Sequence, residues 1–268
     1  MPRAIWNGSI SFGLVNIPVK LYNAVSRKNV SFHQIDSDSG ARIKMQRVSS
    51  KTGEEVPYER IVKGFEISPD RYVVITPEEL DNLDPKATRA IDIEDFVELD
   101  QIDPVHYERP YYLVPEKGAA KAYALLLQAM KDSNKVAIAR MVLRTKQYLA
   151  AIRPKGDILC LETMLFADEV VDEAELDGVP GDDVEVSERE LKMARQLIES
   201  LSTDFEPEKY QDEYRERVLA LIEAKAEGAE IVAQAASEEP AQVVDLMAAL
   251  EASLAAARAA KEEEQSGS

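Results

Sequence analysis

Hydrophobic and polar residues alternate along the first part of the chain in the way that predicts β-strands. Residues 4–25 alternate and turn like a sheet, and the same pattern returns at residues 91–97 and 111–115. Residues 136–161 hold three apolar stretches with a turn at residues 154–156, which predicts a β-meander. Residues 30–35 and 42–48 also predict a pair of strands around a polar tip.

Helical spacing is typical of the remaining segments. Residues 119–131 predict a helix, and a capping box at residues 187–190 begins another. Pro207 is expected to open a third helix that runs to about Ala226. The last amphipathic helix has a stripe of apolar side chains made of Val243, Met247, Leu250 and Leu254.

These patterns predict a mixed α/β protein with a β-rich core and a helical C-terminal arm. We expect a core over residues 1–166, an acidic connector with helices over 167–226, and a linker with the terminal helix over 227–268. The helices of the middle part are expected to pack on the core or on a dimer mate.

Charge is unevenly distributed along the chain. The net charge is −18, but residues 1–165 hold 23 Lys and Arg against 22 Asp and Glu, whereas residues 166–268 hold 9 against 28. Two stretches without any acid, residues 39–53 and 133–156, carry candidate phosphate-binding cations. Arg27 and Lys28 precede the first stretch and are counted with it. The candidate phosphate-binding residues are Arg27, Lys28, Arg42, Lys44, Arg47, Lys51, Lys135, Arg140, Arg144, Lys146, Arg153 and Lys155.

Two interpretations of these cations stay open at the level of residue pattern. A cationic strip across a sheet can face phosphates, since alternate residues of a strand share a face. The same residues are equally typical of a solvated sheet face on which Lys and Arg protect an edge. Because exposed charges are screened within roughly 8 Å at physiological salt, the acidic C-terminal part does not exclude a local basic surface.

Several chemistries lack the residues that they require. The one cysteine, Cys160, lies in an apolar strand and has no cysteine partner for zinc. Gly-rich phosphate loops and a nucleophile elbow are absent from the sequence. The acids at residues 92–100 are interpreted as a solvated strand face rather than a metal site. We therefore expect a binding protein without metal or cofactor, not an enzyme, and no apolar run suggests a membrane span.

The N-terminus carries a specific resemblance. Residues 3–22, RAIWNGSISFGLVNIPVKLY, resemble the opening of bacterial Ku proteins, and the resemblance continues through residues 102–105, 110–113, 148–154 and 204–210. It covers about residues 1–230.

This resemblance implies a ring-shaped homodimer of β-barrel cores and bridging strands that slides onto a double-stranded DNA end without reading sequence. It further implies recruitment of a multifunctional ATP-dependent DNA ligase through the C-terminal part, for non-homologous end joining, in the cytoplasm and at the nucleoid. The apolar stripe of the terminal helix is the expected docking surface, with packing on the protein's own core or on the dimer mate as the alternative. The runner-up interpretation is a protein-only scaffold whose basic strands bind acidic partners.

The chain departs from some Ku relatives in two places. Residues 49–53 read SSKTG where those relatives carry a Cys-x-x-Cys-Gly knuckle, so no metal is expected there. The chain ends in KEEEQSGS instead of a Lys-rich tail, so we expect no DNA binding by the tail.

Overall fold

The computed structural model describes residues 2–83, 89–143, 146–181, 184–228 and 246–266. The chain divides into two units, which are described separately below. The first unit comprises residues 1–28 and 32–173, and the second comprises residues 29–31 and 174–268. No helix in the described ranges is long and apolar enough to cross a membrane.

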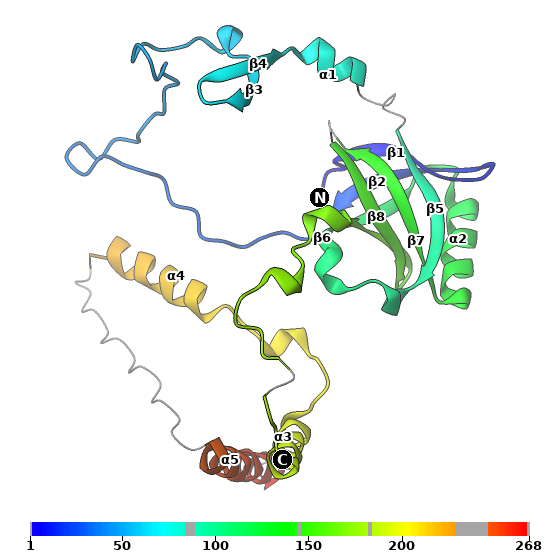
Figure 1. The fold of residues 1–268 in the computed structure, drawn as a ribbon, viewed down its shortest axis with the longest axis vertical. Helices are drawn as coiled ribbons and strands as arrows, with labels where there is room; N and C mark the ends of the chain where they lie inside the picture. Colours follow the sequence, from blue (N-terminus) through cyan, green and yellow to red (C-terminus); the bar gives the residue numbers. More distant parts are fainter. Residues whose placement is uncertain (1, 84–88, 144–145, 182–183, 229–245, 267–268) are drawn as a thin grey trace. The chain divides into compact units, whose positions relative to one another are not determined.

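Seven strands of the first unit close into a barrel (Figure 1). Around the barrel they are ordered β1, β2, β6, β9, β8, β7 and β5. Neighbouring strands are antiparallel, except that β1 and β5 close the barrel in parallel. Their bounds are β1 Trp6–Phe12, β2 Val15–Asn23, β5 Ala90–Glu98, β6 Tyr107–Pro115, β7 Lys135–Leu143, β8 Lys146–Lys155 and β9 Ile158–Met164.

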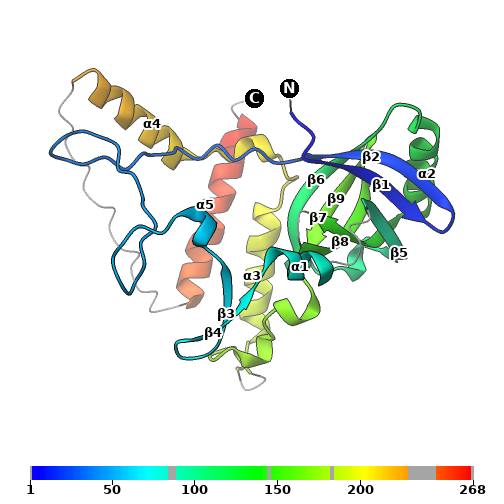
Figure 2. The same cartoon turned by 90° about the horizontal axis from the view of Figure 1, so that it is seen from above.

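The barrel encloses the main core, and helix α2 (Ala120–Ser133) packs on it (Figure 2). The Tyr123 hydroxyl of α2 donates to the carbonyl of Leu113 at 2.6 Å and accepts from the amide of Leu159 at 2.7 Å. This hydroxyl therefore joins the end of β6 to the start of β9. The fully buried aliphatic side chains of the core are Ile10, Ile17, Val19, Leu21, Ile91, Leu113, Ile152, Leu159 and Leu161.

A long excursion separates β2 from β5. Residues 24–62 contain only isolated bridges, Ile35 with Arg42 and Val48 with Glu55, and the short turn η1 (Tyr58–Arg60). The strands predicted at residues 30–35 and 42–48 are therefore wrong. Apolar and polar residues do alternate over residues 42–48, but this segment has no neighbouring strand with which to form a hydrogen-bonded ladder. Its apolar positions are therefore not covered, and Met45 is 88% exposed.

The excursion ends in regular structure. Strands β3 (Lys63–Ser68) and β4 (Arg71–Ile75) form a separate two-stranded sheet, and α1 (Pro77–Leu83) follows. Thr76 caps α1, because its hydroxyl accepts from the amide of Glu79 at 3.2 Å. Two short turns, η2 (Leu99–Gln101) and η3 (Pro104–His106), connect β5 to β6.

Helices make up the regular structure of the C-terminal part. After η4 (Ala167–Glu169) and η5 (Glu173–Glu175) come α3 (Glu188–Leu201), η6 (Pro207–Lys209), α4 (Glu213–Ala226) and α5 (Leu246–Ser266). Pro207 opens only a single turn, so the predicted helix start is wrong. Asp212 caps α4 instead, accepting from the amide of Arg215 at 2.9 Å. The predicted β-rich core with a helical C-terminal part is confirmed, while the boundaries at residues 166 and 226 stay predictions.

Candidate nucleic-acid interface

The predicted cations fall into two sets that differ in their surroundings. We name as the meander set Lys135, Arg140, Arg144, Lys146, Arg153 and Lys155, and as the loop set Arg27, Lys28, Arg42, Lys44, Arg47 and Lys51. Arg144 lies outside the described residues.

Strand β5 supplies acids to two cations of the meander set. Lys135 Nζ lies 3.0 Å from Glu98 Oε1, and Arg140 Nε lies 3.3 Å from Glu94 Oε1. Both contacts follow from the antiparallel pairing of β5 with β7, which places Glu98 directly opposite Lys135. The acids of residues 92–100, interpreted from the sequence as a solvated face, thus include two ion-pair partners.

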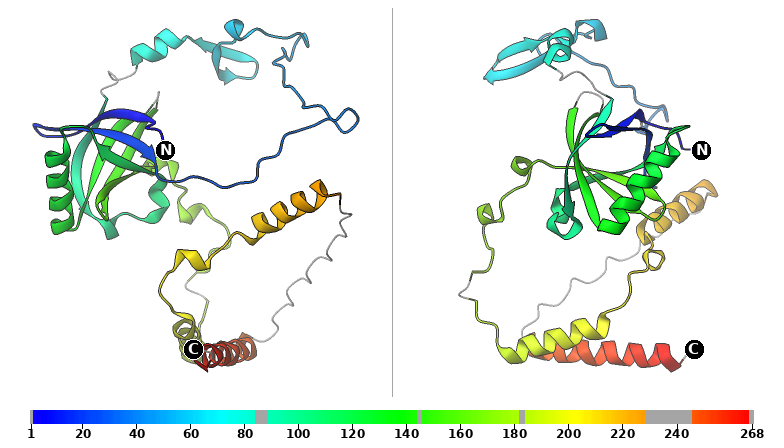
Figure 3. Two further views of the ribbon diagram at one scale, coloured as in Figure 1. Left: turned by 180° about the vertical axis from the view of Figure 1, so that it is seen from behind. Right: turned by 90° about the vertical axis from the view of Figure 1, so that its right-hand side faces the viewer.

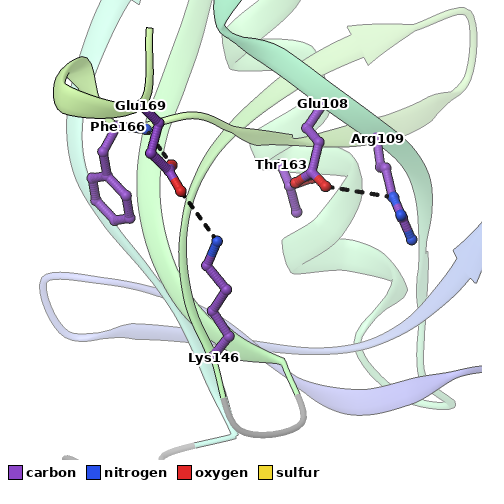
Figure 4. Close-up of polar contacts among 6 residues, drawn as sticks. All are labelled: Glu108, Arg109, Lys146, Thr163, Phe166 and Glu169. Atoms are coloured by element: carbon purple, nitrogen blue, oxygen red, sulfur yellow. Dashed lines mark hydrogen bonds and ion pairs between the residues drawn. The ribbon is translucent and has the colours of Figure 1, made fainter. Parts of the chain in front are cut away.

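Lys146 is paired with an acid from beyond the barrel strands (Figure 4). Its Nζ lies 3.3 Å from Glu169 Oε1, and the other carboxylate oxygen accepts from the amide of Phe166 at 2.9 Å. The Phe166 amide, with a further contribution from Lys146, lowers the pKa of Glu169. Lys146 Nζ also lies 5.3 Å from the centre of the Tyr148 ring.

Arg153 makes the tightest contact of the meander set. Its Nη2 lies 2.7 Å from Glu162 Oε1, and its Nε donates to both carboxylate oxygens at 3.2 and 3.3 Å. The Arg153 side chain is 30% exposed and that of Glu162 only 12%. The hydrogen bond to Glu162 raises the pKa of Arg153. Phosphate contact by Arg153 would have to compete with this largely buried bidentate pair.

A hollow of about 520 Å³ lies beside this pair. Apolar side chains such as Ile102 and Pro110 line it together with Arg109, which is held 3.6 Å from Glu108 (Figure 4). The Tyr107 hydroxyl is buried there without a hydrogen-bond partner in the described structure, and burial raises its pKa. Lys155, by contrast, is exposed and belongs to no ion pair among the described residues.

The loop set lies on an exposed backbone with no acid close enough to neutralise it. All six side chains are exposed, and none belongs to an ion pair in the described parts of the chain. Arg47 has a different neighbour, since its guanidinium lies 5.5 Å from the centre of the Tyr58 ring. The nearby acid Asp36 already accepts a hydrogen bond from the Ser39 hydroxyl, and this bond lowers the pKa of Asp36.

This contrast decides which cations can attract phosphates. A cation 3 Å from a carboxylate forms a pair with no net charge, whereas an unpaired cation attracts a phosphate within the Debye length with its full charge. The loop set therefore supplies six unpaired cations to the first unit, within one segment of the chain. Arg60, exposed in the same excursion, is a further unpaired cation that the sequence reasoning missed because Glu59 precedes it.

The predicted partner-binding stripe lies on α5. Leu254 is 8% exposed, Met247 and Leu250 are half-buried, and Val243 lies outside the described residues. Within the described ranges, no group of His, Cys, Asp or Glu side chains is arranged to hold a metal ion.

Comparison with known proteins identifies the barrel. Residues 11–193 match the family model of the Ku70/Ku80 beta-barrel domain. The chain belongs to the Ku family. It is 56% identical over 259 residues to the non-homologous end joining protein Ku of Anaeromyxobacter sp. strain K, covering 96% of this chain and 87% of that relative.

More distant members align over nearly the same length. The non-homologous end joining protein Ku 1 of Saccharopolyspora erythraea is 46% identical over 259 residues, covering 96% of this chain and 80% of the relative. The Ku protein of Archaeoglobus fulgidus is 42% identical over 251 residues, covering 93% of this chain and 99% of the relative. The resemblance at residues 3–22 and the Ku-type barrel predicted from it are thereby confirmed.

Arg153 gives a direct test of the pairing in the meander set. We expect Arg153→Ala to lower the free energy of unfolding by about 3 kcal/mol, because it leaves the Glu162 carboxylate poorly solvated and unpaired. Lys155→Ala, two residues along the same strand, should change it by less than about 0.5 kcal/mol. Urea unfolding followed by circular dichroism measures both.

A double variant separates the pair from simple loss of packing. Adding Glu162→Ala to Arg153→Ala should recover part of the lost stability, because no unpaired charge remains. Equal losses in Arg153→Ala and Lys155→Ala would contradict the structural role of the pair.

Proposed function

We propose that this protein binds ends of double-stranded DNA without sequence preference as a ring-shaped homodimer, and recruits a multifunctional ATP-dependent DNA ligase for non-homologous end joining. The observation that carries the proposal is the loop set, six exposed and unpaired cations on one excursion of a Ku-family barrel. The relatives are named for non-homologous end joining, which supports the same function for this chain.

Phosphate contact suits a protein that must accept any DNA end. Contacts to phosphate and sugar position a protein on DNA and carry no sequence information. Affinity from such contacts comes mainly from counterion release, so it depends steeply on salt. Long Lys and Arg side chains on an extended backbone can follow a phosphate path, and the loop set offers them on residues 27–51.

Exposed apolar side chains of the same excursion support a homodimer. Phe32, Phe65 and Val74 are 73%, 66% and 53% exposed. A two-stranded sheet such as β3–β4 is marginal by itself in water. Since large exposed apolar surface marks interaction sites, a second copy that pairs with this excursion would both cover the side chains and place two loop sets around one duplex.

The salt dependence of end binding tests which cations contact DNA. If three of the four cations Arg42, Lys44, Arg47 and Lys51 in each of two chains neutralise phosphates, the slope of log affinity against log salt is roughly −5. Replacing Arg42, Lys44, Arg47 and Lys51 by Gln should bring that slope close to zero. Titration of a blunt duplex at several salt concentrations measures it.

A matched triple variant serves as the control. Lys135, Arg140 and Lys146 replaced by Gln should leave the slope within about one of the wild-type value, because those cations are already paired within the chain. Should the triple variant lose the slope and the quadruple variant keep it, the meander set would be the phosphate-binding surface instead.

Ring geometry makes a separate prediction about DNA topology. A closed ring can reach duplex only through an end, so linear duplexes should compete at least about tenfold better than closed circles of the same sequence, measured by competition with a labelled linear probe. Linearising the circle with a restriction enzyme should restore its competition. Circles that compete equally before cutting would reject threading.

The alternative is a protein-only scaffold whose basic residues bind acidic partners. The acidic C-terminal part, with 28 acids against 9 bases after residue 165, could itself be such a partner. No detectable binding to a blunt duplex at low salt would favour this alternative.

A further inference from the structure

The apolar face of α5 already contacts another helix of the chain. Helices α3 and α5 lie side by side in the second unit (Figures 1 and 3). Leu254 is the one buried hydrophobic side chain among the described residues of 174–268. Arg189 Nη2 of α3 lies 3.4 Å from Glu251 Oε1 of α5, one turn from Leu254.

Helix α3 presents two different faces. Leu191, Ala194 and Leu197 are half-buried, whereas Ile198 is 66% exposed. Helix α3 begins with signals of its own, because the Ser187 hydroxyl accepts from the amide of Glu190 while the Glu190 carboxylate accepts from the amide of Ser187. These caps stabilise the start of α3 independently of its contact with α5.

We propose that α3 competes with the ligase for the apolar face of α5, so that docking requires α5 to leave α3. The proposal rests on the proposed recruitment of a ligase and on the expectation that the ligase docks on the apolar stripe of α5. The apolar face of α5 cannot contact α3 and the ligase at the same time. Leu254 on this face is only 8% exposed, so it has no free surface for the ligase to bind. The apparent dissociation constant is then the intrinsic one divided by the fraction of chains in which α5 is free.

The contact is suited to opening. Among the described residues it buries only Leu254 below a tenth exposed and leaves neighbours such as Leu197 and Leu250 half-buried. The Arg189–Glu251 pair is exposed on both sides, at 76% and 58%, so this pair adds little. These features describe a low-stability element of the kind that switches state when a partner binds.

Neighbouring leucine and isoleucine residues of α3 offer a matched test in the full-length chain. Leu197→Gln should speed amide exchange of α5 by roughly tenfold and tighten binding to the ATP-dependent ligase of the same organism by a similar factor. Ile198→Gln, on the exposed face, should change neither. Hydrogen exchange and titration with labelled ligase measure the two effects, and duplex-end binding checks that each variant is folded.

A cross-link supplies the opposite perturbation. In a Cys160→Ala background, Arg189→Cys and Glu251→Cys joined by a reducible bis-maleimide should hold α5 on α3. We expect ligase binding to fall at least about tenfold and to return when the linker is reduced. Undiminished binding by the cross-linked protein would overturn the proposal, because the helix pair would then dock intact.

The outcomes distinguish this proposal from ligase recruitment itself. Faster α5 exchange in Leu197→Gln with unchanged ligase affinity would overturn the competition alone. Ligase binding that is the same in the wild type and in a chain lacking residues 240–268 would overturn recruitment through α5, and the competition with it. Unchanged α5 exchange in Leu197→Gln would show that α3 does not hold α5.

Discussion

Closure of the barrel is the constraint on which the rest of the structure depends. Strand β1 meets β5 in parallel, and the Ser9 amide donates to the carbonyl of Arg89 at 2.8 Å. Gly8 permits this approach, because a Cβ there would lie 2.3 Å from the Arg89 oxygen. Because all seven strands pair into a closed barrel, the sheet has no free edge strand to which the excursion between β2 and β5 could add a further strand. The excursion's exposed apolar side chains and its cations therefore lie outside the sheet of the barrel.

The same closure determines the electrostatics. Strand neighbours bring acids to the cations of the barrel, Glu94 to Arg140 and Glu162 to Arg153, and these pairs satisfy charges that a crowded sheet surface would otherwise desolvate. Residues 24–62 of the excursion lack strand neighbours, and the loop set has no ion-pair partner among the described residues. Apart from Lys155, the described meander set and the loop set thus differ in ion pairing, although both sets look alike as stretches of sequence without acids.

Local pattern predicted much of the fold. The meander strands, the helix after residue 119 and the Ser187 capping box follow from residue order alone, and the N-terminal resemblance identified the family. Ion pairs such as Lys135–Glu98 join residues 37 positions apart through the register of β5 with β7, which no local pattern contains. At residues 42–48 the local pattern was misleading: the side chains alternate as in a strand, but the segment forms only isolated bridges. Alternation yields a strand only where another strand is available to pair with it.

The central claim is that DNA lies against the excursion rather than against the barrel meander. Site-specific photo-cross-linking tests it most directly, with a benzophenone amino acid placed once at Lys44 and once at Arg140 and a radiolabelled blunt duplex as the target. The account predicts an end-dependent cross-link from position 44 and little or none from position 140. Efficient cross-linking from position 140 with none from position 44 would contradict it.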